Sequence, residues 1–240
     1  MEPFLVGTLW GICSLASMAA AVRWHFPYIR SRTEGATLPE KNSTMDFQGA
    51  FLGEKKEHGN IFRSRLYIAA VVLLACTAGF RADFFADSYI SLIKLLIGSC
   101  VVSCAVMTDL EFMLIPNFYI EVLLIARVLL LLPEYLTDST SVVPKLVSSL
   151  IGLLFCLFTL FIVSVVTRGG LGYGDVKLVA CLAFLTGLYA GINTIILSCF
   201  SCGIAAAYFL LSGRKGLKDA IAFAPFILLG YEVMIIIAAY

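Results

Sequence analysis

Charged side chains are scarce in this chain of 240 residues, where Lys, Arg, Asp and Glu make up 14% of the sequence. A soluble domain carries about a quarter of such residues. Hydrophobic residues make up 60%, and the mean hydropathy is +0.96. The formal net charge is only +1, so the chain lacks the basic excess of a nucleic-acid-binding protein. These shortages exclude an ordinary soluble domain and a nucleic acid partner, and they indicate that the chain lies in a lipid bilayer.

Metal-ligating side chains are also few or badly placed. Only two histidines occur, and all eight cysteines fall in apolar runs, so we expect neither a disulfide framework nor a metal site. Cys199 and Cys202 have the spacing of a metal-ligand pair, but no second pair or histidine lies near them in sequence. We expect them to be small buried residues between helices.

The apolar runs predict an all-α, polytopic membrane protein with about eight transmembrane helices, because several are long enough to cross roughly 30 Å of hydrocarbon. The first run lacks the basic start of a signal peptide, so we interpret it as a retained helix. We divide the chain into residues 1–65, a helix followed by a cytoplasmic loop, and residues 66–240, a membrane-embedded domain. The expected spans are 4–22, 66–80, 89–107, 118–132, 145–166, 177–191, 194–211 and 221–239.

The distribution of basic residues predicts the orientation in the membrane. The loop 23–65 carries eight Lys and Arg residues, whereas the expected outer loops 81–88, 133–144 and 192–193 carry one base and four acids. Because basic loops remain in the cytoplasm, the loops 108–117, 167–176 and 212–220 face the same side. Both ends of the chain then face outward.

Two acids fall at cytoplasmic span boundaries: Asp109 in "MTDLEFMLIPN" and Asp175 in "RGGLGYGDVKL". An ionisable group at such a boundary is costly to desolvate and suggests a function. Two carboxyls brought together can share one proton, so that one activates water as a general base while the other polarises a scissile carbonyl. Each acid taken alone is also typical of a helix cap or a solvated loop.

The residues around these acids fit a hydrolytic site. Gly172 and Gly174 lack Cβ atoms where a substrate strand would approach the backbone. Pro116 ends regular structure after the first acid, and Asn117 can cap the following helix. Lys177 is a candidate supporting residue, and its ordinary interpretation is a lysine that extends to the cytoplasmic interface. "GYGD" by itself is also typical of a turn.

The segments "TDLEFMLIPN" (108–117) and "GGLGYGDVKL" (169–178), in this order, resemble the two motifs of the type IV prepilin peptidases, which are GxGD membrane aspartyl proteases. A third segment, "AFAPFILLG" (222–230), resembles the family's last helix, except that Ala222 stands where a proline is expected. The resemblance extends over about residues 66–240. It implies that Asp109 and Asp175 are the catalytic acids, shaped by Gly172 and Gly174, with Pro116, Asn117 and Lys177 in support.

The resemblance also implies a substrate and a place in the cell. The substrates would be prepilins or pilin-like pseudopilins, cut at the cytoplasmic face of a prokaryotic plasma membrane, in a pilus, secretion or DNA-uptake (competence) system. Hydrolysis would need no metal or organic cofactor. Many family members also use S-adenosylmethionine to methylate the new amino terminus and carry paired CxxC motifs in the first loop, which is cysteine-free here. A tetrathiolate zinc site cannot form in that loop, which places methylation in doubt.

Other functions remain open on sequence alone. A peptidase of the same family acting on preflagellins would have the same motifs. A carrier that binds a proton or cation through the two acids is a different class, although transport acids tend to lie near the membrane midplane. A non-catalytic assembly factor would tolerate the loss of either acid.

Overall fold

The computed structural model describes residues 3–21, 23, 72–73, 75–81, 88–167, 170–212 and 221–237. Apart from residue 23, the predicted loop 23–65 lies outside this part of the chain, as does the beginning of the predicted span 66–80. The described residues form helices joined by short connections and contain no strand. The helices are α1 (Pro3–Ala20), α5 (Tyr89–Phe112), α6 (Asn117–Thr137), α7 (Val142–Val166), α8 (Tyr173–Thr186), α9 (Leu188–Leu211) and α10 (Ala224–Ile237), and residues 75–81 are helical as well.

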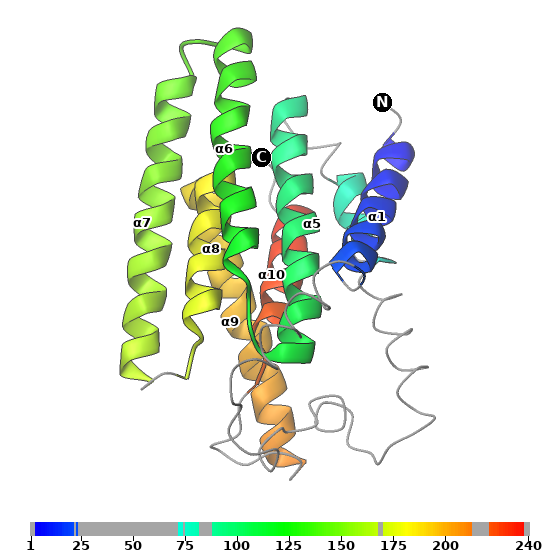
Figure 1. The fold of residues 1–240 in the computed structure, drawn as a ribbon, viewed down its shortest axis with the longest axis vertical. Helices are drawn as coiled ribbons and strands as arrows, with labels where there is room; N and C mark the ends of the chain where they lie inside the picture. The colour runs from blue at the N-terminus through cyan, green and yellow to red at the C-terminus, as the bar shows by residue number, and fades with distance from the viewer. Residues whose placement is uncertain are drawn as a thin grey trace.

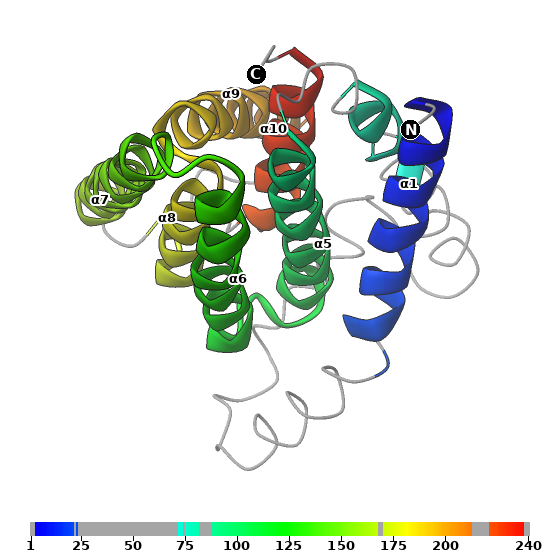
Figure 2. The ribbon, with the colours of Figure 1, turned by 90° about the horizontal axis from the view of Figure 1, so that it is seen from above.

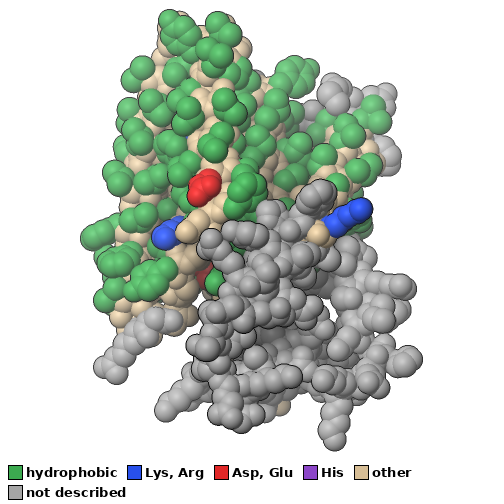
Figure 3. Space-filling view, viewed as in Figure 1, with side chains coloured by type: hydrophobic (Ala, Val, Ile, Leu, Met, Phe, Trp, Pro, Cys, Tyr) green, Lys and Arg blue, Asp and Glu red, His purple; other side chains and the backbone are tan. Residues whose placement is uncertain are grey.

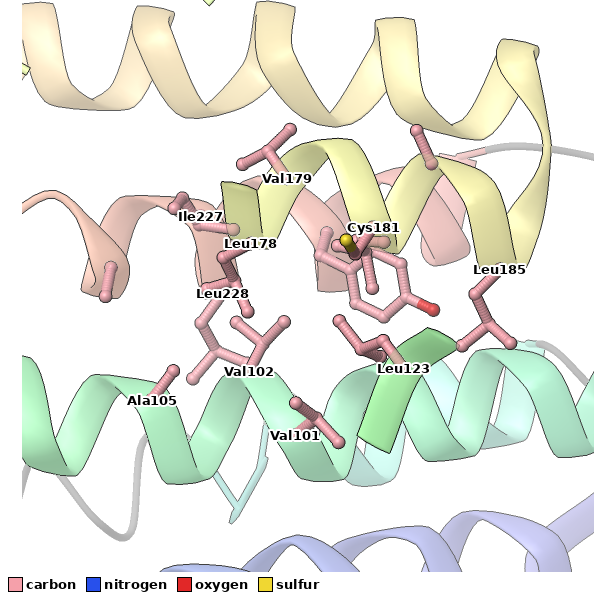
Figure 4. Packing of buried hydrophobic residues seen from close by; sticks show 14 of the residues in the cluster. Val101, Val102, Ala105, Leu123, Leu178, Val179, Cys181, Leu185, Ile227 and Leu228 are labelled. Atoms are coloured by element: carbon pink, nitrogen blue, oxygen red, sulfur yellow. The ribbon is translucent and has the colours of Figure 1, made fainter. Parts of the chain in front are cut away.

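Two short helices occupy the centre of the bundle. α8 packs against α5, α6, α7 and α9, and α10 packs against α5 and α9, whereas α1 contacts α5 on the side away from α7 (Figures 1 and 2). Figure 4 shows side chains of α5, α6, α8 and α10 meeting in the core, among them Val102, Leu123, Leu178 and Leu228. α8 is apolar on nearly all sides because it is enclosed by other helices, as expected for a buried helix.

The outer face of the bundle is suited to lipid. The visible part of the described surface in Figure 3 is almost entirely apolar, with isolated charged side chains. Within the described residues, three helical segments are long and apolar enough to cross a membrane: Tyr89–Leu110, Val142–Val166 and Leu188–Leu211. α1 and α10 are apolar but shorter. The fold is therefore an all-helical membrane protein, as the sequence predicts, and the count of eight spans stays a prediction.

Several predicted boundaries were wrong. α5 continues to Phe112, so Asp109 lies inside the helix rather than beyond its end. The connection from α8 to α9 is Gly187 rather than residues 192–193. Gly187 has φ +101°, a conformation that glycine adopts without the strain of a side chain, and this allows the chain to reverse in one residue. α6 extends to Thr137, which leaves an outer turn of only four residues before α7.

Polar side chains inside the bundle form an ion-pair network that we had not predicted. Glu134, which we assigned to an outer loop, is buried in α6. Its carboxylate accepts hydrogen bonds from Lys94 of α5 and, at 2.7 Å, from Arg127 of α6. Arg127 is completely buried. The network joins α5 to α6 in the half of the bundle that is remote from Asp109 and Asp175.

The cysteines behave only partly as expected. All eight are free, in agreement with the prediction that no disulfide framework exists. The prediction that Cys199 and Cys202 are buried between helices was wrong, because Cys199 is exposed and Cys202 is half-buried on α9. Close helix contacts are made instead by glycine. A Cβ atom on Gly230 of α10 would lie 2.7 Å from the backbone nitrogen of Ser198, so only glycine allows α9 and α10 to approach this closely.

Candidate active site

Asp109 and Asp175 come together at one end of the bundle. Asp109 lies in the last turn of α5 and Asp175 in the first turn of α8, and Figure 1 shows both helix ends in the lower part of the bundle, above the lower end of α9. They are 6% and 7% exposed. The two carboxyls are close enough for their charges to interact, although 66 residues separate them in sequence. Both acids therefore lie at the same end of the bundle, and their role as a catalytic pair stays a prediction.

The two carboxyls have different surroundings. Asp109 Oδ2 accepts a hydrogen bond at 3.2 Å from the backbone N–H of Ala224, the first residue of α10. Asp175 Oδ1 is buried and has no hydrogen-bond partner among the described residues. A buried, unpartnered carboxyl oxygen is costly unless a water or a substrate group binds it. Among the described residues, the site therefore holds one carboxyl that a hydrogen bond orients and one carboxyl with an oxygen that no such bond orients.

The chain around Asp109 explains how the first acid is placed. α5 ends at Phe112, and Met113 adopts a left-handed conformation with φ 51°, so that its N–H donates to the Asp109 carbonyl at 2.9 Å. Pro116 follows in an extended conformation and directly precedes α6, where a proline is readily accommodated. The prediction that Asn117 caps this helix was wrong. Asn117 is its first residue, Pro116 holds the capping position, and no side chain makes a capping hydrogen bond.

The glycine segment around Asp175 is a helix start and not a flexible loop. Gly172 holds the capping position of α8 with φ −66°, and Gly174 already lies in the helix. Ser164 of α7 donates a hydrogen bond at 2.9 Å to the Leu171 carbonyl, which attaches this segment to its neighbour. The two glycines therefore serve close approach rather than unusual backbone angles.

Each glycine admits a particular neighbour. A Cβ atom on Gly172 would lie 3.0 Å from Asp175 Oδ2, so any side chain there would press on the carboxyl. A Cβ atom on Gly174 would lie 3.1 Å from Ile115 Cβ, in the connection between α5 and α6. Gly174 thus allows the two motifs to pack directly on one another. Lys177 is exposed on α8, and its supporting role stays a prediction.

The close packing at Gly174 leads to a test. Gly174→Val should lower kcat for the reaction proposed below by about tenfold to a hundredfold, because displacing Ile115 shifts α8 against α5, and misplacement by 1 Å can cost about a hundredfold. Gly203→Val on α9 is the matched control, since a Cβ atom there would meet nothing within 4 Å. Equal rates for the two variants would contradict this function of Gly174.

The contact between the Ala224 backbone and Asp109 was not predicted, nor was the burial of Glu232 in α10. The Ala224 contact comes from the backbone, which carries no residue-type signal. Glu232 did leave a signal, because it is the one acid in the apolar run 221–239, and an isolated acid within such a run commonly marks a functional position.

The region of the chain that holds both acids is similar to a known family. Residues 95–207, which contain both acids, match the model of the type IV leader peptidase family. The third segment that we compared with the family, 222–230, lies beyond the matched region.

Two curated relatives carry related names. The "Prepilin leader peptidase/N-methyltransferase" of Bacillus subtilis (strain 168) is 29% identical over 174 residues, which cover 70% of this chain and 64% of that protein. The "Leader peptidase HopD" of Escherichia coli is 36% identical over 61 residues, covering 25% of this chain and 39% of that protein. The chain therefore spans less than two thirds of either leader peptidase. No solved structure matches the chain.

Proposed function

We propose that this protein is a membrane aspartyl endopeptidase that removes the basic leader peptide of type IV prepilins or pilin-like pseudopilins. The burial of Asp109 and Asp175 at the same end of the bundle is the observation that carries this proposal. Because like charges disfavour two ionised carboxyls at one buried site, we infer that the pair holds a single proton. The ionised carboxyl then takes a proton from the attacking water, and the protonated one donates to the carbonyl oxygen of the scissile peptide.

The end of the bundle that holds the two acids fits a cytoplasmic active site. α1 runs toward this end and is followed in sequence by the loop 23–65 with its eight bases. α9 also ends there, and its connection to α10 carries Arg214, Lys215 and Lys218. Basic segments remain in the cytoplasm. The apolar helix of a pilin precursor would lie in the bilayer. The scissile peptide bond, which precedes this helix, would then lie at the membrane depth of Asp109 and Asp175.

The position of the acids also separates this proposal from a carrier. Transport acids are expected near the membrane midplane, within reach of both sides. Asp109 and Asp175 lie at helix ends, at one edge of the bundle. A preflagellin-type peptidase would use the same pair, so the choice between these substrates rests on the leader that is cleaved.

A cleavage assay in membranes tests the proposal. The chain is co-expressed with a full-length pilin or pseudopilin precursor from the same genome, and the product is read by gel shift and N-terminal mass. Loss of the leader is expected with the wild type and not with the double variant Asp109→Asn, Asp175→Asn. Full-length product with the wild type across prepilin, pseudopilin and preflagellin leaders would refute the peptidase.

The chain should work without zinc. Hydrolysis by a carboxyl pair needs no metal, and the loop 23–65 has no cysteine with which to form a tetrathiolate site. Metal analysis of the purified protein is therefore expected to find well under one zinc per chain, and one zinc per chain would contradict this prediction. An added methyl mass on the cleaved product would show separately that methylation by S-adenosylmethionine occurs without those cysteines.

A further inference from the structure

Glu232 is the most deeply buried acid of the described chain and has no part in the chemistry above. It lies in α10 with 0% of its surface exposed. One carboxylate oxygen accepts a hydrogen bond from Ser99 of α5, and the other is buried with no hydrogen-bond partner among the described residues. A buried acid at mid-helix destabilises a membrane protein unless its hydrogen bonds serve a purpose.

The hydrogen bond to Glu232 belongs to a chain of bonds that crosses three helices. Trp10 of α1 donates its indole N–H to the Ser99 hydroxyl at 3.2 Å, and Ser14 of α1 lies 3.5 Å from the same oxygen. Since the Ser99 oxygen accepts from Trp10, its own hydrogen is available for Glu232. The bonds from Trp10 to Ser99 and from Ser99 to Glu232 therefore run in one direction, whereas either hydroxyl of the Ser14–Ser99 pair could be the donor.

The same two helices, α5 and α10, meet again at the active site. Ser99 precedes Asp109 by ten residues, about 15 Å along α5, and Glu232 follows Ala224 by eight residues, about 12 Å along α10. The helices are antiparallel, so the Ser99–Glu232 bond and the Ala224–Asp109 bond belong to one register. Tyr231 supports this register by donating a hydrogen bond to the Leu95 carbonyl at 3.1 Å.

Apolar contacts alone define such a register poorly. Within lipid there is little hydrophobic drive between helices, and apolar side chains can exchange partners when one helix slides along another. A buried polar contact is different, because a slide by one turn would leave the carboxyl among apolar groups. Fixing register is the best-attested use of such contacts.

We propose that Glu232 is a positioning residue for the active site, whose bond with Ser99 fixes the axial register of α10 against α5 and so holds the Ala224 N–H on the Asp109 carboxylate. This inference rests on the proposed peptidase function. If it is correct, removing the Ser99–Glu232 hydrogen bond and removing the Ala224 N–H should both leave the Asp109 carboxyl poorly oriented.

Four substitutions test this proposal in the cleavage assay. Ser99→Ala removes the donor, and Glu232→Leu removes the acceptor at similar volume. Glu232→Gln keeps an acceptor, and Ala224→Pro removes a single N–H in the first turn of a helix, where proline is tolerated. Ser103→Ala is the matched control, because Ser103 is buried one turn from Ser99 and its hydroxyl has no hydrogen-bond partner among the described residues.

The expected results are changes in kcat at constant KM. Ser99→Ala, Glu232→Leu and Ala224→Pro should each lower kcat by about tenfold to a hundredfold, with KM for the precursor within about twofold of wild type. Glu232→Gln and Ser103→Ala should stay within about threefold of wild type. Adding Glu232→Leu to Ala224→Pro should cause no further loss, because both act on the same hydrogen bond.

Three outcomes would overturn the proposal. The Ser99→Ala and Ala224→Pro variants could cleave the precursor at the wild-type rate. This result would contradict the positioning role even if the Glu232→Leu variant does not accumulate in membranes. The losses from Glu232→Leu and Ala224→Pro could multiply, which would indicate a general structural effect. If the wild type cleaves no precursor, the peptidase function itself fails. The bond between α5 and α10 is then tested by the free energy of unfolding, where strictly additive losses from Ser99→Ala and Glu232→Leu would refute it.

Discussion

Asp109→Asn and Asp175→Asn are each expected to lower leader cleavage by at least about a thousandfold, with the protein still present in the membrane. General acid–base catalysis contributes about 10² to 10⁴ in rate, and removing either carboxyl removes both functions, because the proton is shared between the two. Asparagine keeps the volume of the side chain, and its amide can still accept the N–H of Ala224 at Asp109. Initial rates in detergent at matched protein concentrations measure the effect.

The double variant should be no slower than the slower single variant. Residues that act as one unit show this strong non-additivity, whereas two independent contributions would multiply.

Asp138→Asn is the control, because Asp138 lies in the turn between α6 and α7. A hydrogen bond from the Thr140 hydroxyl lowers the pKa of Asp138 to about 2, so this acid is ionised at any assay pH. Substantial cleavage by either single variant would exclude the shared-proton mechanism.

The sequence predicts the position of the two candidate acids better than it predicts the contacts around them. Asp109 and Asp175 could be paired because each falls at the boundary of an apolar run on the same side of the membrane. The pairing depends on hydropathy and on the distribution of basic residues, both of which are visible in one chain. The helix start at Tyr173 was not predicted, because glycine is typical of turns, whereas here it allows Ile115 to approach α8.

The polar contacts within the bundle were harder to predict because they depend on which helices are neighbours. Lys94 lies in α5, whereas Arg127 and Glu134 lie in α6, and Glu134 falls in the segment 133–144 that was predicted to be an outer loop. Ser99 is an ordinary small residue in sequence, and only the packing of α10 beside α5 reveals its bond to Glu232. Hydrophobic periodicity and composition predict where helices form, but they do not predict which polar side chains of different helices contact one another.

Glu134→Ala should lower the free energy of unfolding more than any other single substitution in the half of the bundle that is remote from Asp109 and Asp175. The change leaves Lys94 and Arg127 without the carboxylate that pairs with both of them. Breaking a buried ion pair by removing one partner costs about 3–5 kcal/mol, because the remaining charge stays buried without compensation. The free energy of unfolding in mixed micelles measures this loss.

Two comparisons make the Glu134 experiment specific. Glu121→Ala, an exposed position on the same helix, should change the free energy of unfolding by less than about 0.5 kcal/mol. Replacing Lys94, Arg127 and Glu134 together by Met, Met and Leu should restore most of the stability, since apolar side chains of similar volume often replace a buried ionic cluster without loss. Because the network is remote from Asp109 and Asp175, cleavage per folded molecule should be unchanged. If Glu134→Ala lowers the free energy of unfolding by less than about 1 kcal/mol, Lys94 and Arg127 must reach water in the variant. The ion-pair network would then not be sealed from solvent.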